Sequence, residues 1–293
     1  MKARSLLLLL VLTFAGAFAR PALAEGSKVT VESARRLLGN CFHPGGLRLT
    51  ERLGVLLALT RESRVLDVAS GVGTSALFLA ERWGCHVAGV DYGGQNVERA
   101  NELAASKGLA PRVHFDPGDA ERLDFPDASF DAILCECAFC TFPDKSAAAR
   151  EFARVLCPGG RVGISDLTRG TALPQELDGL LAWIACIADA QPAESYADYL
   201  RSARLELRTI ENHDGALVEM VDQIRMKLLG AEILVGLRKL ALPDVDFVSA
   251  KRMAEAARQA IDRGQLGYTV IVAEKNPRRP AEAARLGENQ NHS

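Results

Sequence analysis

The stretch that decides the fold is VLDVASGVGTSA, residues 65–76. It opens with a short apolar run that is typical of a buried strand, and it continues through the turn Gly71-Val72-Gly73 into a helical pattern. Because glycine has no Cβ, such a turn can be tight and a ligand can approach its backbone N–H groups closely. The stretch therefore predicts a strand, a ligand-binding turn and a helix.

Strand and helix patterns alternate around this stretch, which indicates a doubly wound, mostly parallel sheet of seven strands with helices on both faces. The open edge at the carboxyl ends of such strands is where these folds bind ligands. We expect strands at 64–70, 86–91, 112–119, 130–136, 161–167, 205–213 and 267–275, and helices at 47–59, 74–83, 94–107, 145–156, 174–189, 194–203, 214–239 and 249–263.

Three segments organise the chain. Residues 1–24 carry a basic start, an apolar run and a small-residue end, which is the pattern of a secretory or targeting signal. Residues 25–275 form the α/β domain, with a helical insertion at about 214–263 before the last strand, which we interpret as a lid or wall over the carboxyl edge. Residues 276–293 form a loose polar tail.

The composition excludes several classes of function. Of 293 residues, 48% are hydrophobic and 25% are charged, which is a globular composition. The 35 basic residues nearly balance the 37 acidic ones, so we expect no nucleic-acid partner. Seven cysteines is an odd number, spread irregularly, which argues against a disulfide scaffold.

Two cofactors could use the glycine turn. Its spacing up to Ala76, with Asp91 at the end of the next strand, fits a dinucleotide fingerprint and hence an NAD-dependent oxidoreductase. Asp67, however, would place a carboxylate beside the pyrophosphate, and two like charges in a partly buried cleft repel each other. The cationic sulfonium and ammonium groups of S-adenosylmethionine would instead be attracted to it, with Asp91 on the ribose and Asp119 on the adenine amino group.

Residues 64–167 resemble the class I S-adenosylmethionine-dependent methyltransferases. The segments VLDVASGVG, VAGVD, GDAERLDFPDASFDAI and FARVLCPGGRVGISD stand in the order and spacing of that family. The resemblance implies a Rossmann-like methyltransferase fold, with Ala69 in place of the usual glycine. The candidate cofactor-binding residues are Asp67, Ala69, Gly71, Gly73, Asp91, Tyr92, Asp119 and Ala120.

The cysteines after the fourth strand suggest an acceptor. The segment CECAFCTFPDKSAAAREFARVLCPGG, residues 135–160, resembles the arsenite methyltransferases, and Cys137 takes the place of a cysteine of that family. Cys186 matches a second one, and Cys41 could supply a third, so these three are the candidate catalytic residues. Trivalent arsenic prefers thiolates, and its lone pair could accept the methyl group without a general base.

Other interpretations of the cysteines remain open. A zinc clip would need four ligands in spaced pairs, so we expect no metal site. Free cysteines also pack as small hydrophobic residues, and we expect this of Cys85 and Cys157. Cys137 and Cys186 could also only line the pocket of a small-molecule O-, N- or C-methyltransferase. His43 and His213 could orient a substrate or sit in surface loops.

The first segment conflicts with the chemistry of the rest. S-adenosylmethionine is made in the cytoplasm, and exposed thiols would oxidise in an exported protein. Cofactor supply and thiol chemistry thus favour a cytoplasmic location, while residues 1–24 read as a signal. We expect a small-molecule acceptor as the partner, and membrane contact only through residues 1–24 if they are retained. The sequence gives no indication of the oligomeric state.

Overall fold

A computed structural model of the protein describes residues 43–170, 173, 177, 187, 189–239 and 247–277. Several sequence predictions fall outside this part of the chain. They are the segment 1–24, all but two residues of the tail 276–293, the candidate catalytic residues Cys41 and Cys186, and most of the expected helix 174–189.

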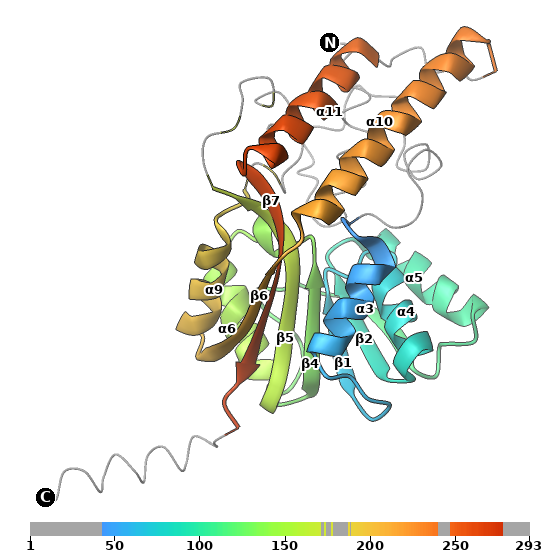
Figure 1. Ribbon diagram of the computed structural model, residues 1–293. Coiled ribbons are helices and arrows are strands. Elements are labelled where there is room, and N and C mark those ends of the chain that lie inside the picture. The colour runs from blue at the N-terminus through green and yellow to red at the C-terminus, as the bar shows by residue number, and fades with distance from the viewer. Residues whose placement is uncertain are drawn as a thin grey trace, which may run out of the picture.

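The centre of the fold is one seven-stranded sheet in the order β3-β2-β1-β4-β5-β7-β6 (Figure 1). All neighbouring strands are parallel except β7, which is antiparallel to both β5 and β6. The strands are β1 Arg64–Val68, β2 His86–Asp91, β3 Val113–Pro117, β4 Phe130–Glu136, β5 Leu156–Arg169, β6 Leu205–Asn212 and β7 Leu266–Lys275. The fold class predicted from the sequence is confirmed.

Helices cover both faces of the sheet, with α3, α4 and α5 on one face and α6 and α9 on the other (Figure 1). Two glycines allow the close packing of α3: a Cβ on Gly54 would meet the Trp83 ring, and one on Gly163 would meet Leu53. The helices are α3 Gly46–Leu56, α4 Thr74–Trp83, α5 Gly94–Ser106, α6 Lys145–Val155, α9 Ala193–Ser202, α10 Asp214–Gly236 and α11 Phe247–Asp262, with the short 3-10 turn η2 Phe139–Thr141.

One boundary differs clearly from the sequence prediction. Strand β5 begins at Leu156 rather than at residue 161, and the Pro158-Gly159-Gly160 stretch therefore belongs to the strand. Leu156 pairs with Phe130, and a register shift follows before Ala132 pairs with Arg161. Proline and glycine usually mark the end of a helix, so the sequence pattern places this stretch outside the strand. An irregular strand start tolerates such residues.

Helices α10 and α11 stand at the carboxyl edge of the parallel strands. Because β7 is antiparallel to its neighbours, β6 runs in the same direction as β5, so β6 ends and β7 begins at this edge. The helical pair connects those two points and rises away from the sheet (Figure 1). The helices stand at the edge where the sequence predicts a lid or wall, and that role stays a prediction. In the part of the chain that the structure describes, no helix combines the length and apolarity needed to cross a membrane.

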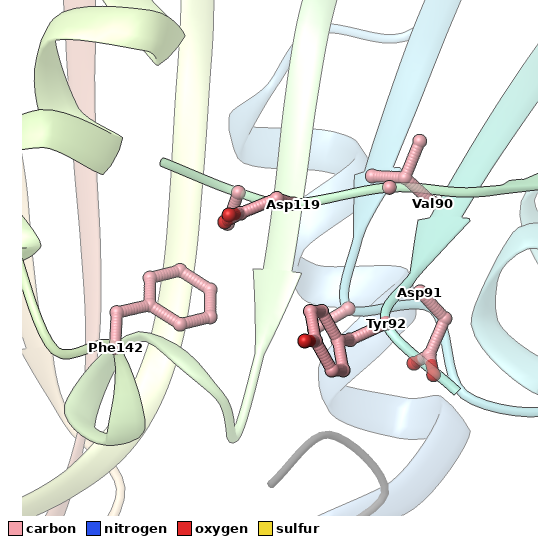
Figure 2. Close-up of a pocket in the computed structure, with 8 residues that line it drawn as sticks. Val90, Asp91, Tyr92, Asp119 and Phe142 are labelled. Atoms are coloured by element: carbon pink, nitrogen blue, oxygen red, sulfur yellow. The ribbon is translucent and has the colours of Figure 1, made fainter. Parts of the chain in front are cut away.

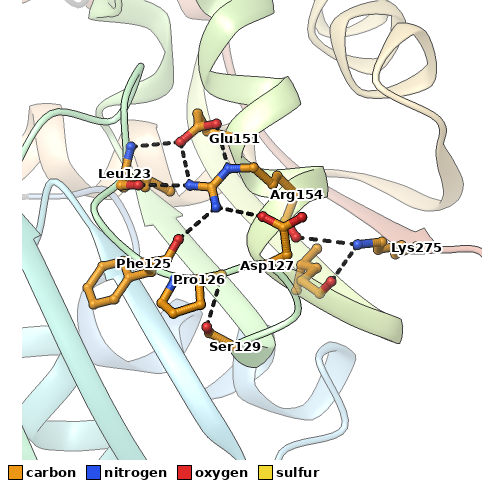
Figure 3. A network of polar contacts seen from close by, with 9 residues as sticks. Leu123, Phe125, Pro126, Asp127, Ser129, Glu151, Arg154 and Lys275 are labelled. Atoms are coloured by element: carbon orange, nitrogen blue, oxygen red, sulfur yellow. Dashed lines mark hydrogen bonds and ion pairs between the residues drawn. The ribbon is translucent and has the colours of Figure 1, made fainter.

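A polar network fixes the loop between β3 and β4 (Figure 3). The Arg154 guanidinium donates to both oxygens of Glu151, at 2.8 Å each, and to the Leu123 and Phe125 carbonyl oxygens at 2.8 and 2.6 Å. It also donates to Asp127 at 2.9 Å. These bonds join α6 to the loop that begins with residues 118–120, which the sequence predicts at the adenine end of the cofactor.

Candidate active site

The register of three strands places three carboxylates on one face of the sheet. Asp67 of β1 pairs with Gly89 of β2 and with Leu134 of β4. Since alternate residues of a strand face the same side, Asp91 and Glu136 share the face of Asp67, each two residues further along. All three lie at the carboxyl edge and all are largely buried.

Asp67 has a buried carboxylate oxygen without a partner. The residue is 3% exposed, one oxygen accepts from the Ala76 N–H of α4, and Oδ2 has no hydrogen-bond partner. Burial, and next the nearby Glu136 and Asp91 carboxylates, hold the pKa of Asp67 well above its ordinary value. A buried charge is stabilised only by a partner, so this site favours a cationic ligand.

Asp91 fixes the glycine turn to the end of β2. Its Oδ2 accepts from the Gly71 N–H at 2.8 Å, and its Oδ1 accepts from the Gly93 N–H at 2.8 Å and from Asn96 Nδ2 at 3.1 Å. Burial raises the pKa of Asp91, although these hydrogen bonds oppose the shift. A carboxylate offers about four acceptor positions, so one position remains for a ribose hydroxyl.

The glycine turn has the conformation that its composition predicts. Gly71 and Gly73 have φ of 56° and 78°, in the left-handed region. A Cβ on Gly73 would come within 2.4 Å of the Phe115 ring, whereas a Cβ on Gly71 would project into open space. Ala69 also has a left-handed φ, of 58°. A left-handed backbone costs a non-glycine residue about 1–2 kcal/mol. This cost explains why the family that the sequence resembles usually has glycine at the position of Ala69.

A cleft lies between the ends of β2 and β3 and the segment after β4. In Figure 2, Asp91 and Tyr92 are on one side and Phe142 is on the other. Among the residues that line this cleft, five were predicted from the sequence: Ala69, Asp91, Tyr92, Asp119 and Ala120. Val90, Gly118 and Phe142 complete the lining and were not predicted. The Phe142 ring comes from a connecting segment, where the sequence carries no periodic pattern that would indicate its direction.

Glu136 is a polar residue that the sequence analysis missed. Its side chain is 4% exposed and accepts from Ser75 Oγ at 2.6 Å and from Thr50 Oγ1 at 3.1 Å. The ring nitrogen Nε2 of His43 lies 3.6 Å from its Oε2. The donors come from α3, from α4 and from the residues before α3. Ser75 and Thr50 are 61 and 86 positions from Glu136, and His43 is further still, so a sequence pattern could not have grouped them.

The cysteines at the end of β4 and directly after it are buried. Cys137 has φ of 55° and donates its N–H to the Ser165 carbonyl oxygen at 2.7 Å. Cys135 and Cys140 are fully buried, and the Cys140 N–H donates to Asp166 Oδ2 at 2.8 Å. Burial, then the charges of nearby carboxylates, hold the pKa of the Cys135 thiol well above its ordinary value, so it is not a ready thiolate.

Of the three candidate catalytic cysteines, only Cys137 is placed, because Cys41 and Cys186 lie outside the described residues. Within the described ranges, no group of three or more His, Cys, Asp or Glu side chains could hold a metal ion. Cys85 is fully buried and Cys157 is half-buried on the opposite edge, beside Arg64. The expectation that these two pack rather than react agrees with their positions.

Comparison with known proteins extends the motif-based resemblance. A family model described as "Methyltransferase domain" matches residues 65–160. Methyltransferase GfsG of Streptomyces halstedii is 30% identical over 230 residues, which are 78% of this chain and 80% of that protein. The 27-O-demethylrifamycin SV methyltransferase of Amycolatopsis mediterranei is 30% identical over 233 residues, 78% of this chain and 83% of that protein.

A solved structure with the same fold is phosphoethanolamine N-methyltransferase 2 of Haemonchus contortus, in complex with phosphomonomethylethanolamine and S-adenosylhomocysteine. Its TM-score is 0.71 at 20% identity, covering 83% of this chain and 56% of that one. These similarities favour methyl transfer over the oxidoreductase alternative. None of the three proteins is named for arsenic.

Proposed function

Because this chain belongs to the S-adenosylmethionine-dependent methyltransferases, we propose that it transfers the methyl group of S-adenosylmethionine to a hydroxyl group of a small organic molecule. The observation that carries the acceptor class is the similarity, over most of both chains, to a relative whose name describes an O-demethylated substrate. A hydroxyl acceptor is one case of the first alternative from the sequence, a small-molecule O-, N- or C-methyltransferase, and that alternative replaces trivalent arsenic as the preferred interpretation.

The residues of the carboxyl edge fit the cofactor. Asp67 presents an unpartnered, buried carboxylate oxygen to a cationic group. Asp91 retains one acceptor position for a ribose hydroxyl, and Asp119 and Phe142 line the same small cleft, on the side where we place the adenine ring. When bound here, S-adenosylmethionine would supply an electrophilic methyl group on a sulfonium sulfur, and its transfer to a hydroxyl oxygen would leave S-adenosylhomocysteine and release the hydroxyl proton to water.

The chain contributes mainly by positioning the two reactants and excluding water. Hydrogen bonds hold the segment after β4 in place: Asp166 accepts from the Cys140 N–H, and Lys145 Nζ donates to the Phe142 carbonyl oxygen at 3.0 Å. The thiols of Cys135 in β4 and of Cys140 in this segment are fully buried and support the packing here.

A direct test uses S-adenosylmethionine with a deuterated methyl group and a panel of phenols, alcohols, amines and arsenite. The proposal expects the deuterated methyl on oxygen, located by mass spectrometry and NMR of the product. The variant Asp91→Asn, tested on the same panel, should slow every reaction together. Label found only on nitrogen or arsenic would overturn the assignment of a hydroxyl acceptor.

A further inference from the structure

Helix α10 is apolar on two opposite faces, and one of them is buried. The buried side chains Leu217, Val221 and Leu228 recur at helical spacing, and α10 packs against α11 and β7. Met226 precedes Leu228 by two residues, which is about 200° around the helix, so it lies on the opposite face. A helix that is apolar all round is normally covered all round. The outer face of α10 therefore indicates a partner that covers it.

Four residues form this outer face, which we call the apolar stripe of α10: Met226, Leu229, Ile233 and Leu237. They follow one another by three or four residues, so they line up along the helix. Their exposed fractions lie between 42% and 67%. Leu234 and, at the start of α11, Val248 are exposed as well. In the part of the chain that the structure describes, these six are more than half of the eleven exposed large hydrophobic residues, so the exposure is concentrated on one helical pair.

Basic side chains flank the stripe. From residue 226 to residue 239 the chain carries one acidic residue, Glu232, and three basic residues, Lys227, Arg238 and Lys239. Glu232 accepts from Lys251 Nζ of α11 at 2.8 Å, so its charge is compensated within the helical pair. Arg238 and Lys239 are exposed at the end of α10. This end is therefore positively charged, although acidic residues outnumber basic residues in the whole chain.

The stripe lies on the part of α10 that projects beyond the sheet. The helix is attached at its start, where Asp214 Oδ1 accepts from the Tyr268 N–H of β7 at 2.8 Å, and it then rises away together with α11 (Figure 1). Ion pairs join the two helices at two levels: Arg258 contacts Asp222 and Lys251 contacts Glu232, at 2.8 Å each. The stripe rises about 16 Å from its first residue to its last. A flat surface can therefore contact its whole length.

The composition of this surface favours lipid over protein as the partner. The stripe consists of aliphatic and thioether side chains, without the aromatic anchors that are typical at the centre of a protein interface. Its basic flank complements the negative surface of anionic lipids. Residues 1–24 independently carry the pattern of a targeting signal, and peripheral membrane proteins commonly combine two weak contacts.

We propose that the apolar stripe of α10 docks on an anionic lipid surface. The four side chains of the stripe enter the boundary between headgroups and acyl chains, and Arg238 and Lys239 contact the headgroups. The helix lies along the surface rather than across it, because its other face is buried. This contact is additional to the one that the sequence predicts through residues 1–24, and it goes beyond the proposed methyl transfer.

The test measures binding of the full chain to vesicles of phosphatidylcholine alone and of an equal mixture with phosphatidylglycerol, by sedimentation. We expect binding to the mixed vesicles that weakens as salt is added. Ile233→Gln should weaken this binding about tenfold, because an exposed apolar side chain no longer enters the lipid. Arg238→Gln should weaken it about fivefold.

Matched controls come from residues of similar exposure on other elements. Val55→Gln changes an apolar side chain of α3 that is 57% exposed, and Arg61→Gln changes an exposed arginine before β1. Both should leave vesicle binding within about twofold, because neither residue belongs to the stripe or its basic flank.

Three results would overturn the proposal. The unaltered chain could fail to bind mixed vesicles at low salt. Ile233→Gln could bind as tightly as Val55→Gln, which would place the lipid contact in another segment, such as residues 1–24. Light scattering without lipid could show a dimer that Ile233→Gln dissociates, which would assign the stripe to a second copy of the chain.

A second measurement uses the unaltered protein, so it does not depend on whether the variants fold. The backbone N–H groups of residues 226–237 should exchange with deuterium more slowly when mixed vesicles are present. Those of α5, on a face of the sheet away from the stripe, serve as the internal control and should not change. Slower exchange in neither helix, or equally in both, would contradict docking through α10.

Discussion

The two sides of the carboxyl edge differ in the side chains that they bury and expose. At the ends of β1 and β2, Asp67 and Asp91 bury carboxylates to 3% and 1% exposure. On α10, which rises from the same edge beyond β6, Met226 and Ile233 leave apolar side chains 67% and 62% exposed. The ends of β1 and β2 thus bury acidic groups, whereas α10 exposes hydrophobic surface to solvent.

The difference shows how strictly each region restricts the ligand that it can contact. Burying a carboxylate is costly unless a ligand or hydrogen-bond donor compensates it, so the first region suits one defined cationic ligand. Exposed apolar side chains tolerate many partners and set no geometry of their own. The cofactor side is therefore sensitive to single-atom changes, while α10 should tolerate substitution.

The largest effect is expected at the glycine turn. Gly73→Ala places a Cβ against the Phe115 ring and forces a left-handed φ on alanine, so unfolding free energy should fall by about 3–5 kcal/mol and cofactor binding should be lost. Chemical denaturation and calorimetry measure both. Gly94→Ala, at the first turn of α5 with no atom near the new Cβ, should be neutral. Equal stability of the two variants would show that the turn is not constrained.

The next effect concerns the cofactor alone. Both oxygens of Asp91 accept hydrogen bonds from N–H donors, so the amide nitrogen of Asp91→Asn must face a donor. We expect a loss of about 1.5–3 kcal/mol in cofactor binding, measured by calorimetry. Asp116→Asn, an exposed acid on β3, is the control. Unchanged affinity in Asp91→Asn would place the ribose elsewhere.

A smaller effect is expected from the polar network of Arg154, which supports the loop predicted to contact the adenine. Lysine cannot reproduce the forked contacts of Arg154, so Arg154→Lys should lower unfolding free energy by about 1–2 kcal/mol. The Arg154 guanidinium lowers the pKa of Glu151, so this stability is present above the ordinary pKa of glutamate and is lost as pH falls through the lowered value. Arg150→Lys, on an exposed face of α6, is the control. Equal denaturation midpoints at neutral pH would contradict the prediction.

The smallest effect is expected on α10. Ile233→Gln changes an exposed side chain, so unfolding free energy should change by less than about 0.5 kcal/mol and cofactor affinity should stay the same. Leu228→Ala, one and a half turns earlier on the buried side, should cost about 2–4 kcal/mol. A clear loss of cofactor affinity in Ile233→Gln would show that α10 belongs to the cofactor site and would break the comparison.

The same division explains how much the sequence could predict. The glycine turn, Asp67 and Asp91 lie within one stretch of 25 residues on consecutive elements, so their proximity follows from strand order alone. Glu136 escaped because its partners Thr50 and His43 come from before β1, and their approach depends on how α3 packs. The arsenic acceptor was inferred from Cys41, Cys137 and Cys186, and only Cys137 lies in the part of the chain that the structure describes, so the thiol spacing alone could not identify the acceptor.

The central claim is that the buried charge of Asp67 binds a cation of the cofactor. In the ligand-free protein the raised pKa of Asp67 favours its protonated form, so its contribution to stability is lost as pH rises through that value. A bound ammonium group favours the ionised form, so binding must release a proton and affinity must rise with pH.

Calorimetry of S-adenosylmethionine binding in two buffers with different ionisation enthalpies counts that proton. We predict net proton release at pH values between the ordinary pKa of aspartate and the raised pKa of Asp67 in the unaltered protein, and none from this site in Asp67→Asn. Identical proton counts in the two proteins at every pH would contradict the account.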